Sequence, residues 1–413
     1  MKRSIPLLAA AGLLLAGCSS PGRPVVTVDQ ATTLADQPVH LKVTGAPAGK
    51  PVQVGAEAVD RDGKTWHSEA TFTADDHGTV ELDSAKPSGG SYQDADGMGL
   101  FWSLDPATGD AGTQRFVPPI ENGRPVAHLD VFVSRDGKRL ATTALTRQWM
   151  AAGATTKSLS MATNKLTGVY IAPEPDGAKH PAVLLLGGSE GGIPSTLYAV
   201  LLASHGYPVL ALAYFHAPGV PNELRNIPVE YFASAARWLT RQPAVDPARL
   251  VAMGVSYGTE AALLVSDHFP DLVHGTLLFA PSATATSSFP KPDGSAWTYQ
   301  GKPVDFVPIP VDEVDGPVLA VAGSDDLLWG SRLSAQRIMQ ELDDAHDKYP
   351  HEAVIVPGAG HLVSGTPYLP SGTEEIHPVT GQHLDLGGTR AADESAVRQG
   401  WTKTLALLAS LQR

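Results

Sequence analysis

Residues 251–264 read Val-Ala-Met-Gly-Val-Ser-Tyr-Gly-Thr-Glu-Ala-Ala-Leu-Leu. The apolar run from Leu250 to Met253 predicts a buried strand, and the apolar run from Ala261 to Val265 predicts the start of a helix. Between them, Gly254 and Gly258 flank Ser256. This order of strand, tight turn and helix is what a nucleophile elbow needs, because the turn strains the serine backbone and exposes its hydroxyl near the positive end of the helix. The stretch therefore predicts that Ser256 is a nucleophile; the alternative is a structural serine in a turn.

Length and composition fit a globular protein of two domains. The chain has 413 residues, of which 43% are hydrophobic and 18% are charged. Its formal net charge is -13, and no basic stripe is present that could hold phosphates. We therefore expect no nucleic-acid partner.

The N-terminus has the pattern of a secretory signal. A basic start precedes an apolar run from Pro6 to Ala16, which is too short to span a bilayer. Leu15-Ala16-Gly17-Cys18 then resembles a bacterial lipobox. The resemblance implies a signal over residues 1–18, lipid attachment at Cys18 and a tether over residues 19–23. The alternative is an ordinary cleaved signal that contains a cysteine.

Two further expectations depend on Cys18 and its neighbour. Cys18 is the only cysteine, so the chain can form no intrachain disulfide and has no cysteine nucleophile. Ser19, rather than Asp, follows it. By resemblance to lipoproteins of double-membrane bacteria, this implies a protein anchored in the cell envelope, on the periplasmic side of the outer membrane.

Residues 24–150 predict a module made of strands. Turn pairs such as Asp62-Gly63 and Asp136-Gly137 separate short segments, several of which alternate polar and apolar residues. About eight such strands favour an antiparallel, immunoglobulin-like β-sandwich. We expect Trp66, Trp102 and Trp149 to fill the core or the domain seam. The predicted strands cover residues 25–28, 39–44, 52–60, 66–73, 79–82, 98–104, 127–133 and 140–146.

The second half alternates strands with helices. Residues 151–165 are small and polar and predict a linker, and residues 166–413 predict a mostly parallel sheet with helices on both faces. Active groups of such a domain gather beyond the carboxyl ends of the strands. The predicted strands cover residues 166–172, 181–186, 208–212, 250–253, 275–279, 317–321 and 353–356; the predicted helices cover 198–204, 229–239, a start at 261–265, 333–342 and 391–411.

A glycine-rich turn, Gly187 to Gly192, follows one buried strand. Its spacing is not that of a dinucleotide fingerprint, and we expect no cofactor. In an α/β-hydrolase, this loop supplies one backbone N–H of the oxyanion hole, and the residue after the nucleophile supplies the other. We therefore predict oxyanion donors near Ser189 and at Tyr257; the alternative for the first is a bare turn.

An acid and a base follow two later strands. A serine hydroxyl needs a base to take its proton, and the base needs a carboxylate to fix its tautomer. Asp326 follows the strand at 317–321, and His361 follows the strand at 353–356, in the chain order that α/β-hydrolases use. Asp325 is the reserve candidate for the acid. The other histidines show no metal-ligand spacing, so we expect no metal site.

Several segments together resemble the acyl-CoA thioesterase and bile acid-CoA:amino acid N-acyltransferase family. In the first half these are Ser88-Gly89-Gly90-Ser91-Tyr92 and Met98 to Leu104. In the second half they are Ser204 to Phe215, Ile227 to Phe232, Gly254 to Glu260, Gly323 to Trp329 and Gly358 to His361, with Pro367-Tyr368 beyond. The resemblance implies an N-terminal β-sandwich, an α/β-hydrolase domain, and the roles of nucleophile, acid and base for Ser256, Asp326 and His361. Serine at the nucleophile position is similar to the thioesterase branch, because bile acid-conjugating members use cysteine.

These observations predict a serine hydrolase of acyl thioesters or esters. Tyr257 replaces the usual lysine of the family, and an extracytoplasmic location offers little coenzyme A, so the leaving group stays open. The alternatives are an ester hydrolase, an acyltransferase, and a non-catalytic binding module anchored at the surface. We expect Glu260 to brace the elbow helix and residues 282–312 to cap the acyl pocket. The oligomeric state does not follow from the sequence.

Overall fold

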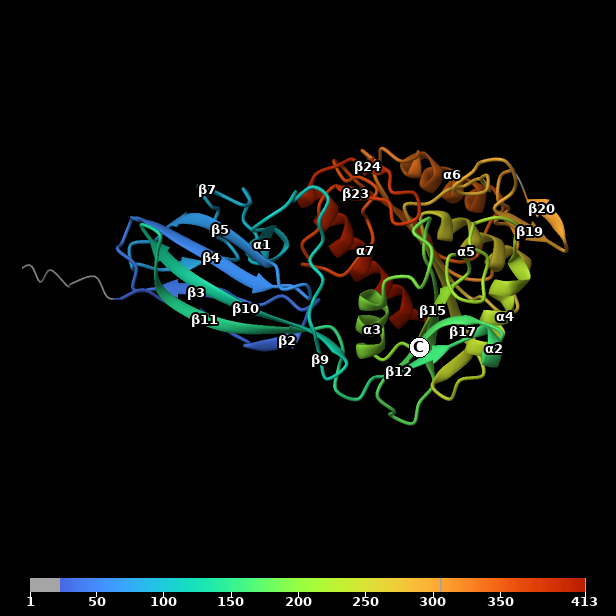
Figure 1. Cartoon of the computed structure of the whole chain (residues 1–413), viewed down its shortest axis with the longest axis horizontal. Coiled ribbons are helices and arrows are strands. Elements are labelled where there is room, and N and C mark those ends of the chain that lie inside the picture. Colours follow the sequence, from blue (N-terminus) through green and yellow to red (C-terminus); the bar gives the residue numbers. More distant parts are fainter. Residues whose placement is uncertain (1–22, 305–306, 413) are drawn as a thin grey trace, which may run out of the picture.

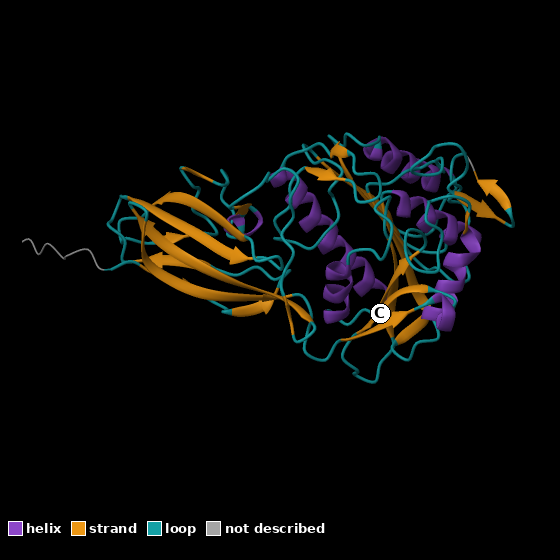
Figure 2. Cartoon of the chain, in the orientation of Figure 1, coloured by secondary structure: helices purple, strands orange, loops and turns teal. Residues whose placement is uncertain are grey.

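The computed structural model describes residues 23–304 and 307–412. A domain built almost entirely of strands lies beside a larger domain of strands and helices (Figures 1 and 2). Cys18, with the predicted signal and all of the tether except Arg23, lies outside the described residues. No helix within these described ranges is long and apolar enough to cross a membrane.

The N-terminal domain contains two sheets around an apolar core. In the large sheet, alternate residues of β4, including Val52, Val54 and Ala56, point inward, as the alternation of the sequence predicts. Trp66 and Phe72 fill the core beneath them. One sheet has the order β1-β3-β6 and the other β2-β11-β10-β4-β5-β7, with β8 and β9 attached at the sides. The strands are β1 (Val25–Val28), β2 (Thr32–Leu34), β3 (Leu41–Thr44), β4 (Pro51–Val59), β5 (Thr65–Thr73), β6 (Val80–Glu81), β7 (Gly89–Gly90), β8 (Asp105–Pro106), β9 (Ile120–Glu121), β10 (Arg124–Arg135) and β11 (Lys138–Gln148).

Two expectations for this domain are wrong. The predicted strand at 98–104 is instead a short helix, α1 (Gly99–Trp102), because the Asp96 carboxylate accepts both the Met98 amide at 2.9 Å and the Trp102 indole N–H at 3.0 Å. These two bonds close a turn that an extended segment could not make. The sandwich is also not wholly antiparallel, because β2, a strand absent from the prediction, pairs with β11 in parallel.

The second domain is built on one eight-stranded sheet of order β12-β13-β15-β14-β17-β18-β21-β22. β13 runs antiparallel to both neighbours, and the strands from β15 to β22 run parallel. β12 (Thr155–Leu159) lies inside the predicted linker, so the sheet begins before Leu166. The other strands are β13 (Thr167–Ala172), β14 (His180–Leu186), β15 (Val209–Ala213), β17 (Val245–Val255), β18 (Thr276–Phe279), β21 (Val318–Gly323) and β22 (His351–Val356).

Helices cover both faces of this sheet. On β14, Val183 and Leu185 point toward α3 and α7, while Ala182, Leu184 and Leu186 point toward α4, α5 and α6. This two-sided burial explains why the strand is a continuous apolar run. The helices are α2 (Met161–Asn164), α3 (Thr196–Ser204), α4 (Val229–Leu239), α5 (Tyr257–His268), α6 (Ser331–Asp344) and α7 (Arg390–Leu411). Short pairings add β16 (Ile227–Pro228), β19 (Trp297–Tyr299), β20 (Lys302–Val304), β23 (Glu374–Ile376) and β24 (His383–Asp385).

Polar groups fasten the two domains together. Asp36 accepts a hydrogen bond from His205 at 2.7 Å and from the Trp401 indole at 3.0 Å. Arg390 reaches from α7 to Asp105 and to the carbonyl oxygens of Trp102 and Leu104. These bonds make the seam an ordered contact between the two domains.

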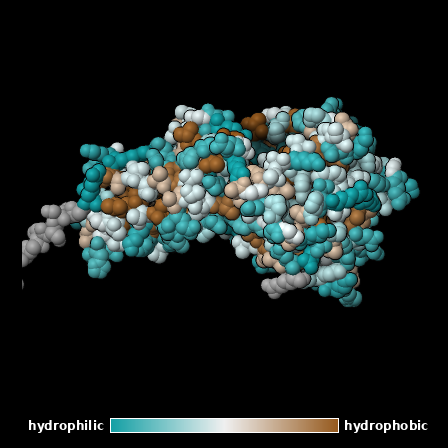
Figure 3. Space-filling view, turned by 90° about the horizontal axis from the view of Figure 1, so that it is seen from below, coloured by the Kyte–Doolittle hydropathy of each residue, from teal (hydrophilic) through white to brown (hydrophobic). Residues whose placement is uncertain are grey.

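On the face in Figure 3, hydrophilic residues predominate and apolar residues form small separate groups.

Candidate active site

Ser256 lies at the turn between β17 and α5. Its backbone angles are φ 54° and ψ -124°, a strained conformation that residues other than glycine rarely adopt. The flanking glycines make the turn possible: a Cβ on Gly254 would lie 2.2 Å from the Gly258 oxygen, and one on Gly258 would lie 2.4 Å from the oxygens of Leu186 and Gly187. The predicted strand, strained turn and helix are confirmed.

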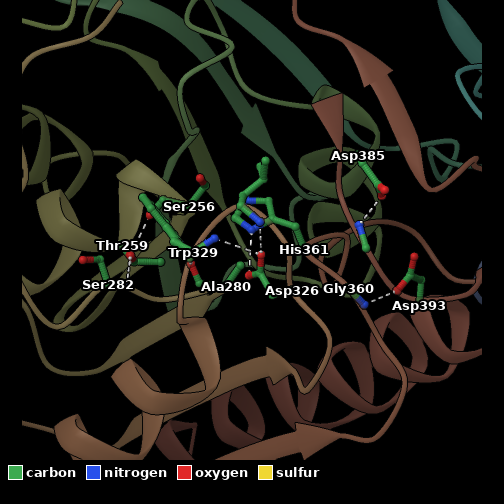
Figure 4. Close-up of polar contacts among 12 residues, drawn as sticks. Ser256, Thr259, Ala280, Ser282, Asp326, Trp329, Gly360, His361, Asp385 and Asp393 are labelled. Atoms are coloured by element: carbon green, nitrogen blue, oxygen red, sulfur yellow. Dashed lines mark hydrogen bonds and ion pairs between the residues drawn. The ribbon is translucent and has the colours of Figure 1, made fainter. Parts of the chain in front are cut away.

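Asp326 and His361 meet beyond the ends of the neighbouring strands β21 and β22. The His361 Nδ1 lies 2.8 Å from the Asp326 Oδ2, as Figure 4 shows. Because an ionised carboxylate only accepts, Nδ1 carries the proton and Nε2 is left as the free base. Asp325 is not the partner; its Oδ1 accepts the Ser324 hydroxyl at 2.6 Å.

The surroundings keep the Asp326 carboxylate charged. Burial alone would raise its pKa, but the hydrogen bond and charge of His361, together with the Leu328 amide, hold the pKa below the usual value. The Trp329 ring lies edge-on to the imidazole at 5.6 Å and donates its N–H to the Ala280 carbonyl at 3.2 Å. The acid and base are therefore held in a fixed orientation.

Ser256 and His361 line one cavity of about 330 Å³. The hydrogen bonds within residues 23–304 and 307–412 do not include a direct one between these two side chains. The apolar residues that line the cavity include Leu185, Tyr198, Met253 and Val397. Charged side chains such as Arg115 and Glu375 also line the cavity, so its wall is mixed, and the apolar part suits an acyl chain.

Two backbone amides border the nucleophile. Tyr257 opens α5, where an amide has no intrahelical acceptor. On the other side, a Cβ on Gly188 would lie 2.9 Å from Ser256 Cβ, so the glycine-rich loop touches the nucleophile. The Gly188 amide donates to the Glu190 carboxylate at 3.0 Å, which leaves the Ser189 amide as the loop's candidate donor. Burial raises the pKa of Glu190, and the hydrogen bonds from the backbone amides of Glu190 and Gly188 oppose this rise.

Sequence reasoning missed several residues around the site. His377 is buried, its Nε2 lies 3.0 Å from the Ser189 hydroxyl, and burial lowers its pKa. Its position in a polar loop rich in glycine and proline gave no signal. Trp102, predicted as core or seam filler, also lines the cavity, as does Arg115. The N-terminal domain therefore forms part of the cavity wall.

The expected cap is wrong. None of the residues that line the cavity comes from the described part of 282–312. That segment packs beside α4 and α5, where the buried Glu260 accepts the Trp297 indole N–H at 2.7 Å and the Thr286 hydroxyl at 2.7 Å. Glu260 thus braces the elbow helix as predicted. The cavity is covered instead by residues 361–375 and the N-terminal domain.

Metal binding has no support in the described part of the chain. No group of three or more His, Cys, Asp or Glu side chains within residues 23–304 and 307–412 could hold an ion. The expectation of no metal and no cofactor stays a prediction.

The strand order, the serine elbow and the acid–base pair define the second domain as an α/β-hydrolase. Family models described as "Acyl-CoA thioester hydrolase/BAAT N-terminal region" and "BAAT / Acyl-CoA thioester hydrolase C terminal" match residues 36–160, and residues 227–290 and 296–411. The chain belongs to this family of acyl-CoA thioester hydrolases and acyltransferases.

Curated relatives extend over both domains. The mouse peroxisomal succinyl-coenzyme A thioesterase is 27% identical over 90% of this chain and 92% of its own length. Mouse acyl-coenzyme A thioesterase 6 is 28% identical over 89% and 92%, and mouse acyl-coenzyme A amino acid N-acyltransferase 1 is 27% identical over 89% and 93%. Among solved structures, the dienelactone hydrolase-like phosphotriesterase P91 is 17% identical with a TM-score of 0.45, over 63% of this chain and 99% of its own.

Proposed function

We propose that the protein hydrolyses acyl thioesters through an acyl-enzyme. Ser256 attacks the acyl carbonyl while His361 Nε2 takes the hydroxyl proton, and Asp326 stabilises the resulting imidazolium. The amides of Ser189 and Tyr257 hold the oxyanion. His361 returns the proton to the leaving thiol. Water then attacks the acyl-enzyme while His361 takes a proton from this water, and His361 passes that proton to the Ser256 oxygen as the free acid leaves.

One observation carries the proposal. The imidazole that Asp326 orients lines the same cavity as the strained Ser256 hydroxyl. Part of the cavity wall is apolar, and Ser189, whose amide is a candidate oxyanion donor, also lines the cavity. Family membership supports the thioester as the reacting group.

A fluorophosphonate probe tests the nucleophile. We expect labelling of the purified chain at Ser256, confirmed by peptide mass, and no labelling of Ser256→Ala. Ser189→Ala, which keeps the backbone amide, is the matched control and should still label. A folded wild-type protein that fails to label, or labels at another serine, would refute the assignment.

A substrate panel tests the leaving group. Acyl-CoAs and p-nitrophenyl esters of matched chain length are compared by kcat/KM. We expect the thioesters to be preferred at each length. A strong preference for simple esters would replace thioester hydrolysis with ester hydrolysis, although the mechanism would stand.

Acyl transfer is a second candidate because similar proteins carry that name. Three of the relatives in mouse and rat are named acyl-coenzyme A amino acid N-acyltransferases. Transfer differs from hydrolysis only in the nucleophile that attacks the acyl-enzyme. Adding amino acids to a thioesterase assay and measuring N-acyl product by mass spectrometry separates the two, since a hydrolase gives free acid alone.

We also propose that the protein is a lipoprotein of the cell envelope, anchored through Cys18 at the periplasmic side of the outer membrane. The signal-like start and the lipobox-like Leu15 to Cys18 support this location. Fatty-acid labelling that is lost in Cys18→Ala tests it. The immunoglobulin-like class of the N-terminal sandwich likewise stays our proposal, supported by its two mainly antiparallel sheets.

A further inference from the structure

Asp393 is a buried carboxyl that the proposed mechanism does not use. It lies in the first turn of α7, lines the cavity and is only 7% exposed. Its Oδ1 accepts the Gly360 amide at 2.7 Å. Its Oδ2 is buried and has no hydrogen-bond partner among the described residues. Buried polar atoms without a hydrogen-bond partner are rare in native proteins.

The Gly360 amide belongs to the turn that presents His361. Two further backbone hydrogen bonds hold this turn: the His361 amide donates to the Leu386 carbonyl at 2.8 Å, and the Thr389 amide donates to the Gly358 carbonyl at 3.1 Å. A Cβ on Gly388 would lie 2.8 Å from the Asp393 Oδ1, so the carboxyl is tightly enclosed. Asp393 therefore fixes the residue immediately before the proposed base, and Figure 4 shows it beside Gly360, on the side away from Ser256.

Few charges face this carboxyl. Burial raises the pKa of Asp393 to about 7, the charge of Asp326 adds to this, and the Gly360 amide and His361 act against it. On its own helix, Arg390 is occupied by Asp105 and two backbone carbonyls. The adjacent Glu394 accepts the Tyr368 amide and lies 3.7 Å from Arg398. His361 is thus the cation that an ionised Asp393 would stabilise.

We propose that Asp393 is a positioning residue for His361: it holds the histidine turn through the Gly360 amide and, when ionised, places a second negative charge behind the imidazole. This inference rests on the proposed hydrolase function. The added charge favours the imidazolium and makes His361 a stronger base when it takes the serine proton. A purely structural role would hold the turn without changing the basicity of the histidine.

Asp393→Asn separates these two effects. The amide oxygen can still accept the Gly360 N–H, but the charge is gone. We expect the acid limb of the kcat/KM profile to move to lower pH by roughly half a unit to one unit, and kcat to fall about 3- to 10-fold with little change in KM. Asp325→Asn is the matched control, because it removes an equal charge near the acid turn from an exposed side chain. It should leave the limb in place.

Asp393→Ala removes the acceptor as well. We expect it to lower kcat further than Asp393→Asn and to lower the melting temperature, because the Gly360 amide loses its partner. An Asp393→Asn profile that superimposes on the wild type, in both midpoint and plateau, would overturn the proposal.

A measurement without substrate keeps the inference testable if the variants fold poorly or the chain proves inactive. In wild-type protein labelled with ¹⁵N-histidine, the His361 imidazole, assigned by its loss in His361→Gln, should titrate in two steps. The second step reports ionisation of Asp393. A single step would refute the coupling, and this result is independent of whether the protein hydrolyses thioesters.

Discussion

The two adjacent aspartates after β21, of which Asp325 is the reserve candidate for the acid, have different surroundings. Asp326 is almost fully enclosed and bonds His361, whereas the side chain of Asp325 is exposed and bonds its neighbour Ser324. The difference arises from the turn: Asp326 Oδ1 accepts the amides of Leu328 and Trp329, which aims Oδ2 at the imidazole. Local backbone donors thus decide which of the two aspartates faces His361.

We expect Asp326→Asn to lower kcat by about 10³- to 10⁴-fold, because the amide favours the wrong histidine tautomer. Asp325→Asn should stay within about 3-fold of the wild type, since its charge is solvated. Steady-state kinetics of both variants, with circular dichroism to confirm folding, checks this. Equal losses in the two variants would contradict the assignment of the acid.

Gly258 is one of the two glycines that leave space for the elbow. The nearest atoms to its missing Cβ are backbone oxygens, which cannot move aside as a side chain could. We expect Gly258→Ala to destabilise the fold by about 2–4 kcal/mol and to abolish probe labelling at Ser256. Gly89→Ala is the control, because nothing lies within 4 Å of its Cβ position and its φ is not positive. Urea denaturation measures both; equal stability would show that the elbow can relax.

Among the elements, those with a clear apolar pattern were predictable from the sequence. Helix α4, which is buried on one side, has the predicted bounds. Strands β14 and β21, which are buried throughout, lie within a residue or two of theirs. Helix α1 was not predictable, because four consecutive buried residues read as a strand until the Asp96 side chain is placed. The polar strand β12 at the sheet edge was also not predicted, because four of its five residues are exposed and show no apolar pattern.

The site followed the same division. Ser256, Asp326 and His361 each stand after a recognisable strand, so chain order predicted them. His377 and Asp393 reach the site through tertiary packing of a loop and of a helix that begins far along the chain, and no local pattern indicates their partners. The cap failed for a related reason: composition suggested a loop over the pocket, but Glu260 bonds Thr286 and Trp297 of that segment, and none of its described residues lines the cavity.

This contact between α5 and residues 286–297 makes a prediction about stability and pH. Burial raises the pKa of Glu260 to about 7 from an ordinary 4.5, against the opposing hydrogen bonds of Trp297 and Thr286. The folded state therefore binds the proton more tightly than the unfolded state. Its contribution to stability is present below pH 4.5 and is lost as the pH rises toward 7.

In Glu260→Gln this pH dependence disappears. At pH 5 the folded Glu260 is protonated, and the Gln amide replaces this neutral acid with a single acceptor oxygen for the Trp297 and Thr286 donors, so we expect only a small loss of stability there. By pH 8 the variant should recover up to about 3 kcal/mol relative to the wild type, which is the value of a shift of this size. Urea unfolding at the two pH values measures the difference. A constant gap between the two proteins would mean that Glu260 does not titrate on folding.

At the scale of the whole molecule, the active-site cavity depends on how the two domains are joined. Trp102 and Arg115 of the N-terminal domain form part of its wall, and Arg115 also bonds Glu375 across the seam at 2.9 Å. Substrate binding should therefore be sensitive to contacts that lie away from Ser256. The catalytic domain alone would present an incomplete cavity.

Arg390 is the side chain that tests this dependence. Its guanidinium donates to Asp105 at 2.5 Å, to the Leu104 carbonyl at 2.8 Å and to the Trp102 carbonyl at 3.1 Å, which places the loop that carries Trp102 against α7. We expect Arg390→Ala to destabilise the protein by on the order of 2–4 kcal/mol, because two buried carbonyl groups and a carboxylate lose a shared donor. The larger effect should be a rise in KM for long-chain substrates, with kcat for short ones changed less, since the wall loosens while the proposed triad stays intact.

Lys403→Ala is the matched control for Arg390→Ala, because it removes a cation from the same helix whose partner, Glu352, lies on β22 of its own domain. It should change neither the stability nor KM by a comparable amount. Thermal unfolding and kinetics across acyl lengths compare the two variants. If both behave alike, the seam does not shape the cavity, and the N-terminal domain would have to act on the substrate in some other way.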